Sequence, residues 1–215
     1  MNIFIVTPIQ RANQRVFYYP QAMASIYALE WQGGTVTHYC PSGGDDGQPD
    51  SINRKYNEAR DVFLAGKWDY FMCAEADMIL PTNALEKLRR LDADIAYGLY
   101  VWRKAKHEWS AYRDLTVTSG VSISKTPDLA RECWGKVIEV AGVGQGCTLI
   151  KRHVIEAQPF RWRQGMITDW LMSIDAQYNN FTQLCDLSVV CGHINGQMVL
   201  YPDPTTDGLF RIDTL

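Results

Sequence analysis

The stretch from Trp68 to Pro81 constrains the fold more than any other part of the chain. It begins as an aromatic and apolar run, typical of a buried strand, and places Glu75 and Asp77 at the end of that run. Alternate residues of a strand point to the same side, and two carboxylates buried there without partners would be unfavourable. A divalent cation is one natural partner, because open α/β sheets bind ligands at the carboxyl ends of their strands. The alternative is a solvated turn after a core strand.

Strand and helix patterns alternate along the chain. The order strand, helix, strand, helix, strand, acids, helix, strand, followed by a mixed half, predicts an α/β fold in one domain. Its central sheet is expected to be mostly parallel and flanked by helices. The predicted strands cover residues 2–6, 35–39, the first part of 68–81, 94–101, 137–140 and 184–190, with an apolar run at 148–150, and the predicted helices cover 20–31, 51–66, 83–91, 152–157 and 167–179.

Two of these patterns also predict which side chains share a face. In the strand 94–101, residues 95, 97, 99 and 101 alternate on one face, and in the helix 167–179, Trp170, Leu171, Ile174 and Tyr178 lie on one side. Residues 103–135 hold only short strand-like pieces, 115–118 and 121–124. Residues 203–215 are expected to form a polar tail with at most one short turn.

Composition limits the class of protein. The chain has 215 residues, a formal net charge of −3 and six cysteines without a CxxC pair. The absence of a basic stripe argues against a nonspecific grip on duplex phosphates. The cysteines fit reduced, mostly buried thiols of a cytosolic protein. No apolar stretch approaches the roughly 20 residues that span a bilayer, and no signal sequence opens the chain, so we expect a soluble, cytoplasmic protein.

Glu75 and Asp77 suit Mg²⁺ or Mn²⁺, which prefer oxygen ligands and keep positions for water and phosphate. His193, beside Gly192, is by itself more often a buried or surface histidine than a ligand. Together with an upstream acid pair it completes an ordinary set for a first-row metal.

Two helical segments carry further candidates. Asp169 follows Thr168 in a predicted first turn, where the helix dipole alone favours an acid; the functional interpretation makes Asp169 a general base. Asn57 and Arg60 lie one turn apart and suit a diphosphate or a base, although a solvated helix face explains them equally well.

Several enzyme classes lack their motifs. The run Gly142-x-Gly144-x-Gly146 stands in mid-chain without the strand and helix of a dinucleotide fingerprint. The sequence contains no Walker A motif and no GxSxG elbow.

Taken in order, these segments resemble the GT-A-fold glycosyltransferases, especially the small family-2-like enzymes of bacteria and their phages. The resemblance covers about residues 1–195. It is carried by Thr7-Pro8, the helix with Asn57 and Arg60, the stretch 68–81, Asp94 to Tyr100, Val143 to Arg152, Thr168-Asp169-Trp170 and Cys191-Gly-His193-Ile194.

The resemblance implies a role for each matching residue. Glu75-Ala76-Asp77 occupies the DxD position, with a glutamate in place of the first aspartate; Asp77 would bind the metal under the donor diphosphate, and Glu75 would approach the metal, ribose or sugar. His193 would complete the metal site. Asp169 would be the base of an inverting reaction. The nucleotide wall would be formed by Thr7, Pro8, Asn57 and Arg60, with Asp45 or Asp46 at the nucleobase and Trp102, Trp109, Tyr112 and Trp170 available for sugars.

The function implied is a Mn²⁺- or Mg²⁺-dependent hexosyl- or pentosyltransferase. Its donor would be a UDP-sugar first and a GDP-sugar second. Its acceptor would be a glycan, a small molecule or a modified nucleobase in DNA, the last reached through a small basic cleft with Arg103, Lys104 and Lys106. The nucleotide-sugar half would cover 1–101, the acceptor half 102–202 and the tail 203–215.

Two other functions remain open. A sugar-nucleotide nucleotidyltransferase uses a similar sheet and metal but needs a glycine-rich basic loop after the first strand, where this chain has Thr7-Pro-Ile-Gln-Arg-Ala-Asn. A non-catalytic nucleotide-sugar or carbohydrate-binding protein of the same fold would keep the cleft without turnover.

Overall fold

The computed structural model describes residues 1–12, 15–41, 47–103, 107–164, 166 and 168–215. Its strands are β1 (Ile3–Val6), β2 (Gln10–Ala12), β3 (Arg15–Phe17), β4 (Val36–Tyr39), β5 (Tyr70–Ala74), β6 (Met78–Ile79), β7 (Ile95–Leu99), β8 (Tyr112–Leu115), β9 (Gly120–Ser122), β10 (Val137–Glu139), β11 (Cys147–Lys151), β12 (Gln183–Val190), β13 (Gly192–Asn195), β14 (Met198–Pro202) and β15 (Phe210–Thr214). Its helices are α1 (Pro20–Tyr27), α2 (Ser51–Ala65), α3 (Ala84–Arg90), α4 (Pro127–Cys133), α5 (Arg152–Ala157) and α6 (Thr168–Tyr178), with a 3₁₀ turn at Ile123–Lys125.

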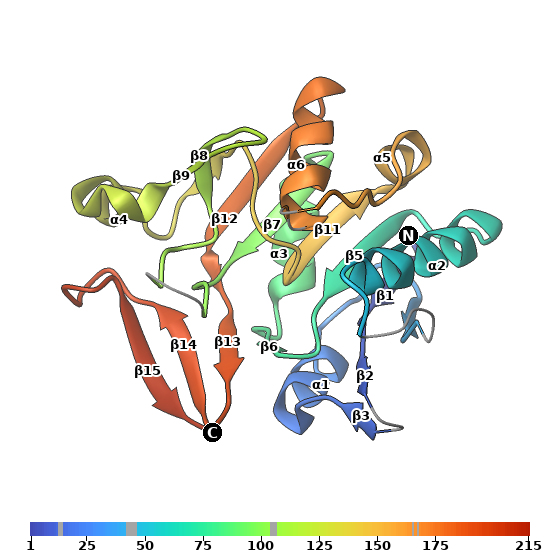
Figure 1. Cartoon of the computed structure of the whole chain (residues 1–215), viewed down its shortest axis with the longest axis horizontal. Coiled ribbons are helices and arrows are strands. Elements are labelled where there is room, and N and C mark those ends of the chain that lie inside the picture. The colour runs from blue at the N-terminus through green and yellow to red at the C-terminus, as the bar shows by residue number, and fades with distance from the viewer. Residues whose placement is uncertain (13–14, 42–46, 104–106, 165, 167) are drawn as a thin grey trace.

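A seven-stranded sheet in the order β10-β12-β7-β11-β5-β1-β4 forms the centre of the molecule. The pairs β1–β4, β1–β5 and β7–β12 are parallel, whereas β11 runs antiparallel to both of its neighbours and β10 antiparallel to β12. Helix α3 packs against β7, β11 and β12, and α2 packs against β1 and α5, while α6 crosses in front of the sheet in Figure 1. The predicted α/β class, with a central sheet flanked by helices, is confirmed.

The core lies in the central strands. All residues of β1 and β7 are buried, as are the last four of β5. The prediction that only one face of strand 94–101 is apolar and buried was therefore incomplete. Ala96 and Gly98, between the larger residues, are buried as well, because helices or loops cover both faces of a central strand.

A second, four-stranded sheet has the order β15-β14-β13-β6. Its strand β6 follows the acids of the Trp68–Pro81 stretch directly, and β13 carries His193, which lies opposite Met78 in the register. The pairing of β6 with β13 thus joins the middle of the chain to its late part, on the lower side of the molecule in Figure 1.

The expected polar tail was wrong in its secondary structure. Within 203–215, Phe210–Thr214 forms β15 and pairs along its length with β14. The segment has the β-branched and aromatic residues of a strand, but its exposed edge position allows a polar composition.

Three details of the helices also differ from expectation. Helix α1 ends at Tyr27, and the chain after it bonds elsewhere: the Glu30 amide donates to the Thr82 carbonyl at 2.8 Å. Tyr178 is 79% exposed because the last turn of α6 extends beyond the core. Helix α4 was missed, although Pro127 at a first helical position, followed by Asp128, is a helix-start signal.

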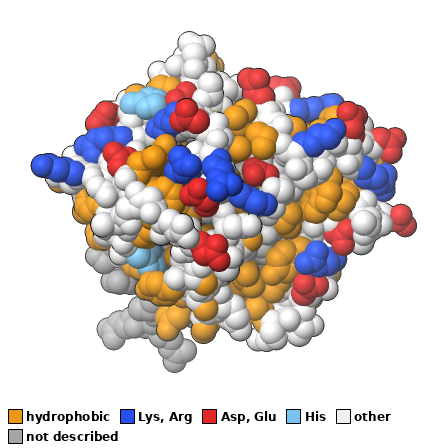
Figure 2. Space-filling view, turned by 180° about the vertical axis from the view of Figure 1, so that it is seen from behind, with side chains coloured by type: hydrophobic (Ala, Val, Ile, Leu, Met, Phe, Trp, Pro, Cys, Tyr) orange, Lys and Arg blue, Asp and Glu red, His pale blue; other side chains and the backbone are white. Residues whose placement is uncertain are grey.

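The surface agrees with the charge pattern of the sequence. On the face seen in Figure 2, Lys and Arg side chains alternate with Asp and Glu and form no purely basic stripe. Within the described residues no helix is both long enough and apolar enough to cross a membrane.

Candidate active site

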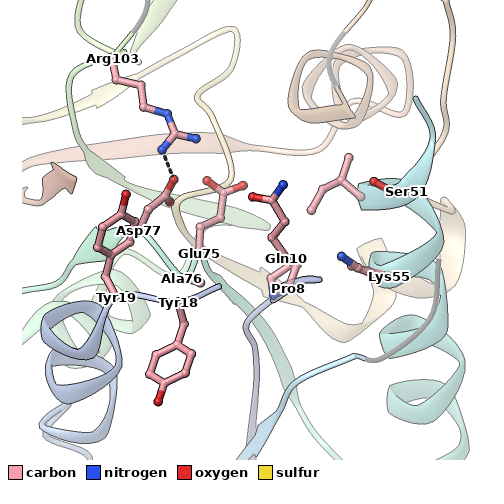
Figure 3. A pocket seen from close by; sticks show the side chains of 11 residues that line it. Pro8, Gln10, Tyr18, Tyr19, Ser51, Lys55, Glu75, Ala76, Asp77 and Arg103 are labelled. Carbon is pink, nitrogen blue, oxygen red and sulfur yellow. Dashed lines mark ion pairs between the residues drawn. The ribbon is translucent and has the colours of Figure 1, made fainter. Parts of the chain in front are cut away.

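A cleft of about 610 Å³ opens at the carboxyl ends of β1 and β5 (Figure 3). The segment after β1, the start of α1, the first turns of α2 and the turn between β5 and β6 form its walls. It is lined by Pro8, Gln10, Tyr18, Tyr19, Ser51, Ile52, Lys55, Glu75, Ala76, Asp77 and Arg103. Of the predicted site residues, the cleft therefore gathers Pro8 and the Glu75-Ala76-Asp77 motif.

The two acids lie on a turn rather than on a continuing strand. Strand β5 ends at Ala74, and the Met78 amide donates to the Glu75 carbonyl at 3.1 Å, which closes the turn before β6. The expected strand alternation is thus the wrong reason for their shared direction. Both carboxylates nevertheless point into the cleft in Figure 3, because the turn is short and its ends are fixed in two different sheets.

Asp77 lies beside two cationic or potentially cationic groups. Its Oδ2 is 2.5 Å from Nη1 of Arg103 and 3.7 Å from Nε2 of His193. The Nδ1–H of His193 donates to the Val101 carbonyl at 2.8 Å, which turns Nε2 of the ring toward Asp77. Burial alone would raise the pKa of Asp77, but His193 and Arg103 outweigh it and lower that pKa below the usual 3.8.

Asp77 and His193 fit a divalent cation in part. A carboxylate oxygen and an imidazole nitrogen are suitable ligands, and the bond from His193 to a backbone carbonyl orients the ring as in known metal sites. The third predicted ligand is not close enough: no three His, Cys, Asp or Glu side chains in the part of the chain that the structure describes form a metal-sized group.

Glu75 has a different environment from Asp77. The Tyr56 hydroxyl is 3.5 Å from its Oε1. Burial, reinforced by the negative charges of Asp169 and Asp77, raises the pKa of Glu75 well above its usual value. A carboxyl with a raised pKa takes up a proton more readily than Asp77, and in that form it can donate a hydrogen bond.

Asp169 lies in the first turn of α6, next to the loop 142–146. The backbone amide of Gln145 donates to its Oδ2 at 3.1 Å. Burial raises the pKa of Asp169 from 3.8 to about 6, although the Gln145 amide and His193 oppose the shift. An acid with this pKa is ionised at neutral pH and can still accept a proton, which suits a general base.

The glycines of the loop permit a close approach to this acid. A Cβ added to Gly144 would overlap the Tyr100 hydroxyl and lie 3.1 Å from Oδ2 of Asp169. No larger residue fits there without displacing one of these side chains. The loop thus places backbone directly against the candidate base.

Among the described residues, several buried polar atoms around Asp169 have no hydrogen-bond partner of normal length and angle. Buried donors are normally satisfied, so such groups cluster at sites of function. The rings form one aromatic group: Tyr100 lies 5.7 Å from Trp102 and 5.3 Å from His193, and Tyr112 lies 5.6 Å from Trp170. The unpartnered atoms are the Tyr100 hydroxyl, Nε1 of Trp102 and Trp170, and both amide atoms of Gln145.

Other predicted residues lie elsewhere. Thr7 is buried and its hydroxyl is 2.8 Å from Nε2 of His38. Asn57 exchanges hydrogen bonds with the backbone of Phe160, and Arg60 donates to the Ile155 carbonyl at 2.8 Å. Of the expected nucleotide wall, only Pro8 lines the cleft. Asn57 and Arg60 bond to backbone groups of the segment after β11.

Two further expectations need comment. Trp109 was expected to offer a sugar platform but is fully buried, with Nε1 donating to the Leu209 carbonyl at 2.6 Å. Asp45 and Asp46, and Lys104 and Lys106 of the basic cleft, lie outside the described residues.

The cleft also contains residues that sequence reasoning did not single out. Ser51 and Lys55 are four residues apart on α2 and share a face. That spacing was readable, but the helix was interpreted through Asn57 and Arg60. Nζ of Lys55 donates to the Ile9 carbonyl at 2.9 Å. No local signal identified Tyr19, whose hydroxyl points toward Asp77 in Figure 3, or Gln145.

No protein-family model and no curated protein sequence matches this chain. Solved structures do. A197 from STIV aligns over 99% of this chain and 93% of its own, with a TM-score of 0.64 and 16% identity. TarS 1–349 of S. aureus in complex with UDP-GlcNAc aligns with a TM-score of 0.51 and 9% identity, and its UDP complex with 0.51 and 10%. Each TarS match covers 86% of this chain but little more than half of TarS 1–349. At these identities the likeness shows the fold, and the predicted GT-A-like domain is confirmed.

Proposed function

We propose that the chain is a glycosyltransferase that moves a sugar from a nucleoside diphosphate sugar to an acceptor hydroxyl. The observation that carries the proposal is the proximity of three groups from distant segments: Asp77 lines the cleft, His193 lies 3.7 Å from it, and both are close enough to Asp169 to shift its pKa. The fold likeness to TarS, solved with UDP-GlcNAc and with UDP, supports a UDP-sugar as the first donor to test.

The donor would lie in the cleft with its diphosphate near the β5–β6 turn. Lys55 and Arg103 supply positive charge at opposite walls of the cleft, and Pro8, Ile52 and Tyr18 supply apolar surface for a nucleoside. Asp77 and His193 would hold Mn²⁺ or Mg²⁺, which when bound neutralises charge on the departing diphosphate. Glu75, with its raised pKa, would donate a hydrogen bond to a donor hydroxyl.

Asp169 would act on the acceptor. It accepts the proton of the attacking hydroxyl as the oxygen bonds to the anomeric carbon and the diphosphate leaves, which inverts the configuration. The Gln145 amide fixes its carboxylate, and burial keeps its pKa near 6. The Tyr100 hydroxyl and the indole N–H groups of Trp102 and Trp170 would donate hydrogen bonds to oxygens of the acceptor substrate. This fits an acceptor with many hydroxyl groups.

A transfer assay tests this proposal. The purified protein is incubated with Mn²⁺ and a panel of UDP- and GDP-sugars, and release of the nucleoside diphosphate is measured with and without candidate acceptors. We expect one donor to be consumed, and Asp169→Asn to remove turnover while the donor still raises the melting temperature.

The matched control is Asp128→Asn, since Asp128 also lies in the first turn of a helix but its side chain is fully exposed in an ion pair with Arg131. Full turnover by the Asp169 variant would contradict the assignment of the base. Donor binding without turnover in the native protein would indicate the non-catalytic alternative. Release of pyrophosphate from a nucleoside triphosphate would indicate the nucleotidyltransferase.

A further inference from the structure

Arg103 binds the oxygen that the proposed metal site needs. Its Nη1 lies 2.5 Å from Oδ2 of Asp77, and the same Oδ2 faces Nε2 of His193 at 3.7 Å. Figure 3 shows the guanidinium entering the cleft above Asp77, with the dashed ion pair between them. One carboxylate oxygen is thus the common point of a guanidinium and of the two candidate metal ligands.

The position of Arg103 is part of the local structure and not a chance surface pairing. Nη1 also donates to the Ile194 carbonyl at 3.4 Å, and the Ile194 amide donates to the Asp77 carbonyl at 2.8 Å. Strand β13 therefore holds both members of the ion pair. The Arg103 side chain is 39% exposed and lines the cleft, so it can turn toward a ligand without leaving a buried site.

A divalent cation and this guanidinium would compete for Oδ2 of Asp77. A cation ligated by Oδ2 and by Nε2 would lie roughly 2.1 Å from each. The guanidinium at its present position would then be one short contact away from a like charge, in a partly buried site where charges are screened less than in water. The repulsion between the two positive charges means that each weakens the binding of the other at Oδ2.

We propose that Arg103 is an exchangeable counter-ion that occupies the metal subsite until a diphosphate arrives and then moves from Asp77 to the phosphate oxygens. The ligand class is a nucleoside diphosphate group, and the inference rests on the proposed function. The planar fork of the guanidinium pairs with phosphate as well as with carboxylate. The exchange frees Asp77 and His193 for the cation when the diphosphate binds. The negative charge of the diphosphate then favours binding of the cation.

The experiment measures ligand binding and not turnover. Mn²⁺ is titrated into the full chain without nucleotide, followed by electron paramagnetic resonance of the free ion. Inorganic pyrophosphate is titrated calorimetrically without metal. Arg103→Gln is compared with Arg103→Lys and with Arg90→Gln, which removes an equal charge from the exposed Arg90–Glu86 pair of α3.

The expected changes have opposite signs. Arg103→Gln should bind Mn²⁺ about tenfold more tightly, because the guanidinium no longer competes with the cation for the Asp77 carboxylate. A neighbouring arginine lowers the pKa of an aspartate by roughly one to three units, so its hold on the carboxylate is strong. The same variant should bind pyrophosphate about tenfold more weakly. Arg103→Lys should stay near the native protein in both titrations, Arg90→Gln should match it, and adding Asp77→Asn to Arg103→Gln should abolish the gain in Mn²⁺ affinity.

Three results would overturn the exchange. These are Mn²⁺ affinity unchanged or weakened in Arg103→Gln, no Mn²⁺ binding by either protein, or unchanged pyrophosphate binding. If Arg103→Gln does not fold, a Mn²⁺ affinity of Arg103→Lys more than tenfold below native would equally contradict it. Because neither titration uses a sugar donor, a failure here is separate from a failure of transfer: an active enzyme with unchanged Mn²⁺ binding would refute the exchange alone.

Discussion

The two sides of the cleft satisfy their polar groups in different ways. On the side of α2 and the β5–β6 turn, the charged groups have protein partners, such as the Ile9 carbonyl for Lys55 and Arg103 for Asp77. Around Asp169, the Tyr100 hydroxyl and the side-chain amide of Gln145 are buried without a partner of normal geometry among the described residues.

The difference shows which side already has hydrogen-bond partners for its polar groups before a ligand binds. A buried polar group left unpaired costs roughly 1–3 kcal/mol, so the Asp169 side carries a cost that the donor side has removed. If the proposed function holds, the donor would have to break the Arg103–Asp77 ion pair to bind, whereas the acceptor would supply hydrogen bonds that the Asp169 side lacks. The following predictions test this contrast, from the largest effect to the smallest.

Asp169→Asn should reduce turnover by about 10²–10⁴-fold, the usual contribution of a general base. In the native protein kcat/KM should rise with pH through a limb near 6, since the pKa of Asp169 is about 6 and the ionised form is the base. Steady-state kinetics from pH 5 to 8 measure both. A native profile that stays flat through pH 6 would refute the assignment.

The same substitution should stabilise the fold at pH 7.5 by about 2–3 kcal/mol. A carboxyl whose pKa rises from 3.8 to about 6 on folding binds its proton more tightly in the folded state. The native protein therefore loses stability as pH rises from about 4 to about 6, and the uncharged amide avoids that loss. Urea unfolding at pH 7.5 and at pH 4 measures it; equal gains at both pH values would show that charge is not the cause.

Gly144→Ala should destabilise the protein by about 2 kcal/mol, because its Cβ would overlap the Tyr100 hydroxyl. The double variant Gly144→Ala, Tyr100→Phe should recover part of this loss, since the nearest atom is gone. Thermal unfolding of the two variants and of Tyr100→Phe completes the cycle. If the effects of the two substitutions on stability simply add, the two residues do not contact each other.

Tyr97→Phe and Tyr100→Phe form a matched pair with opposite expected effects of about 1 kcal/mol. The Tyr97 hydroxyl donates to Oε1 of Gln183 at 2.6 Å, so its loss leaves an acceptor unpaired and destabilises. The Tyr100 hydroxyl has no partner, so its loss should be neutral or stabilising. Urea midpoints compare them directly. An equal loss in both would remove the contrast between a hydroxyl that has a hydrogen-bond partner and one that has none.

The sequence predicted the sheet and one side of the cleft from local signals. Strands β1, β5 and β7 are dense apolar runs because a central strand is buried on both faces. The acids after β5 fall at the carboxyl end of the sheet because the run ends where burial ends. Strand β15 was missed, since an exposed edge strand tolerates the polar residues that resemble a tail.

Long-range pairing decided the rest of the site. Asp77 meets His193 because β6 pairs with β13, and it meets Arg103 because the Ile194 carbonyl holds that guanidinium. Asn57 and Arg60 instead donate hydrogen bonds to carbonyl groups of the segment that packs on α2. Residue types and their order determined which groups can do chemistry here. Only the tertiary structure decided which of them share a cleft, because hydrogen bonds between segments far apart in the chain have no local sequence pattern.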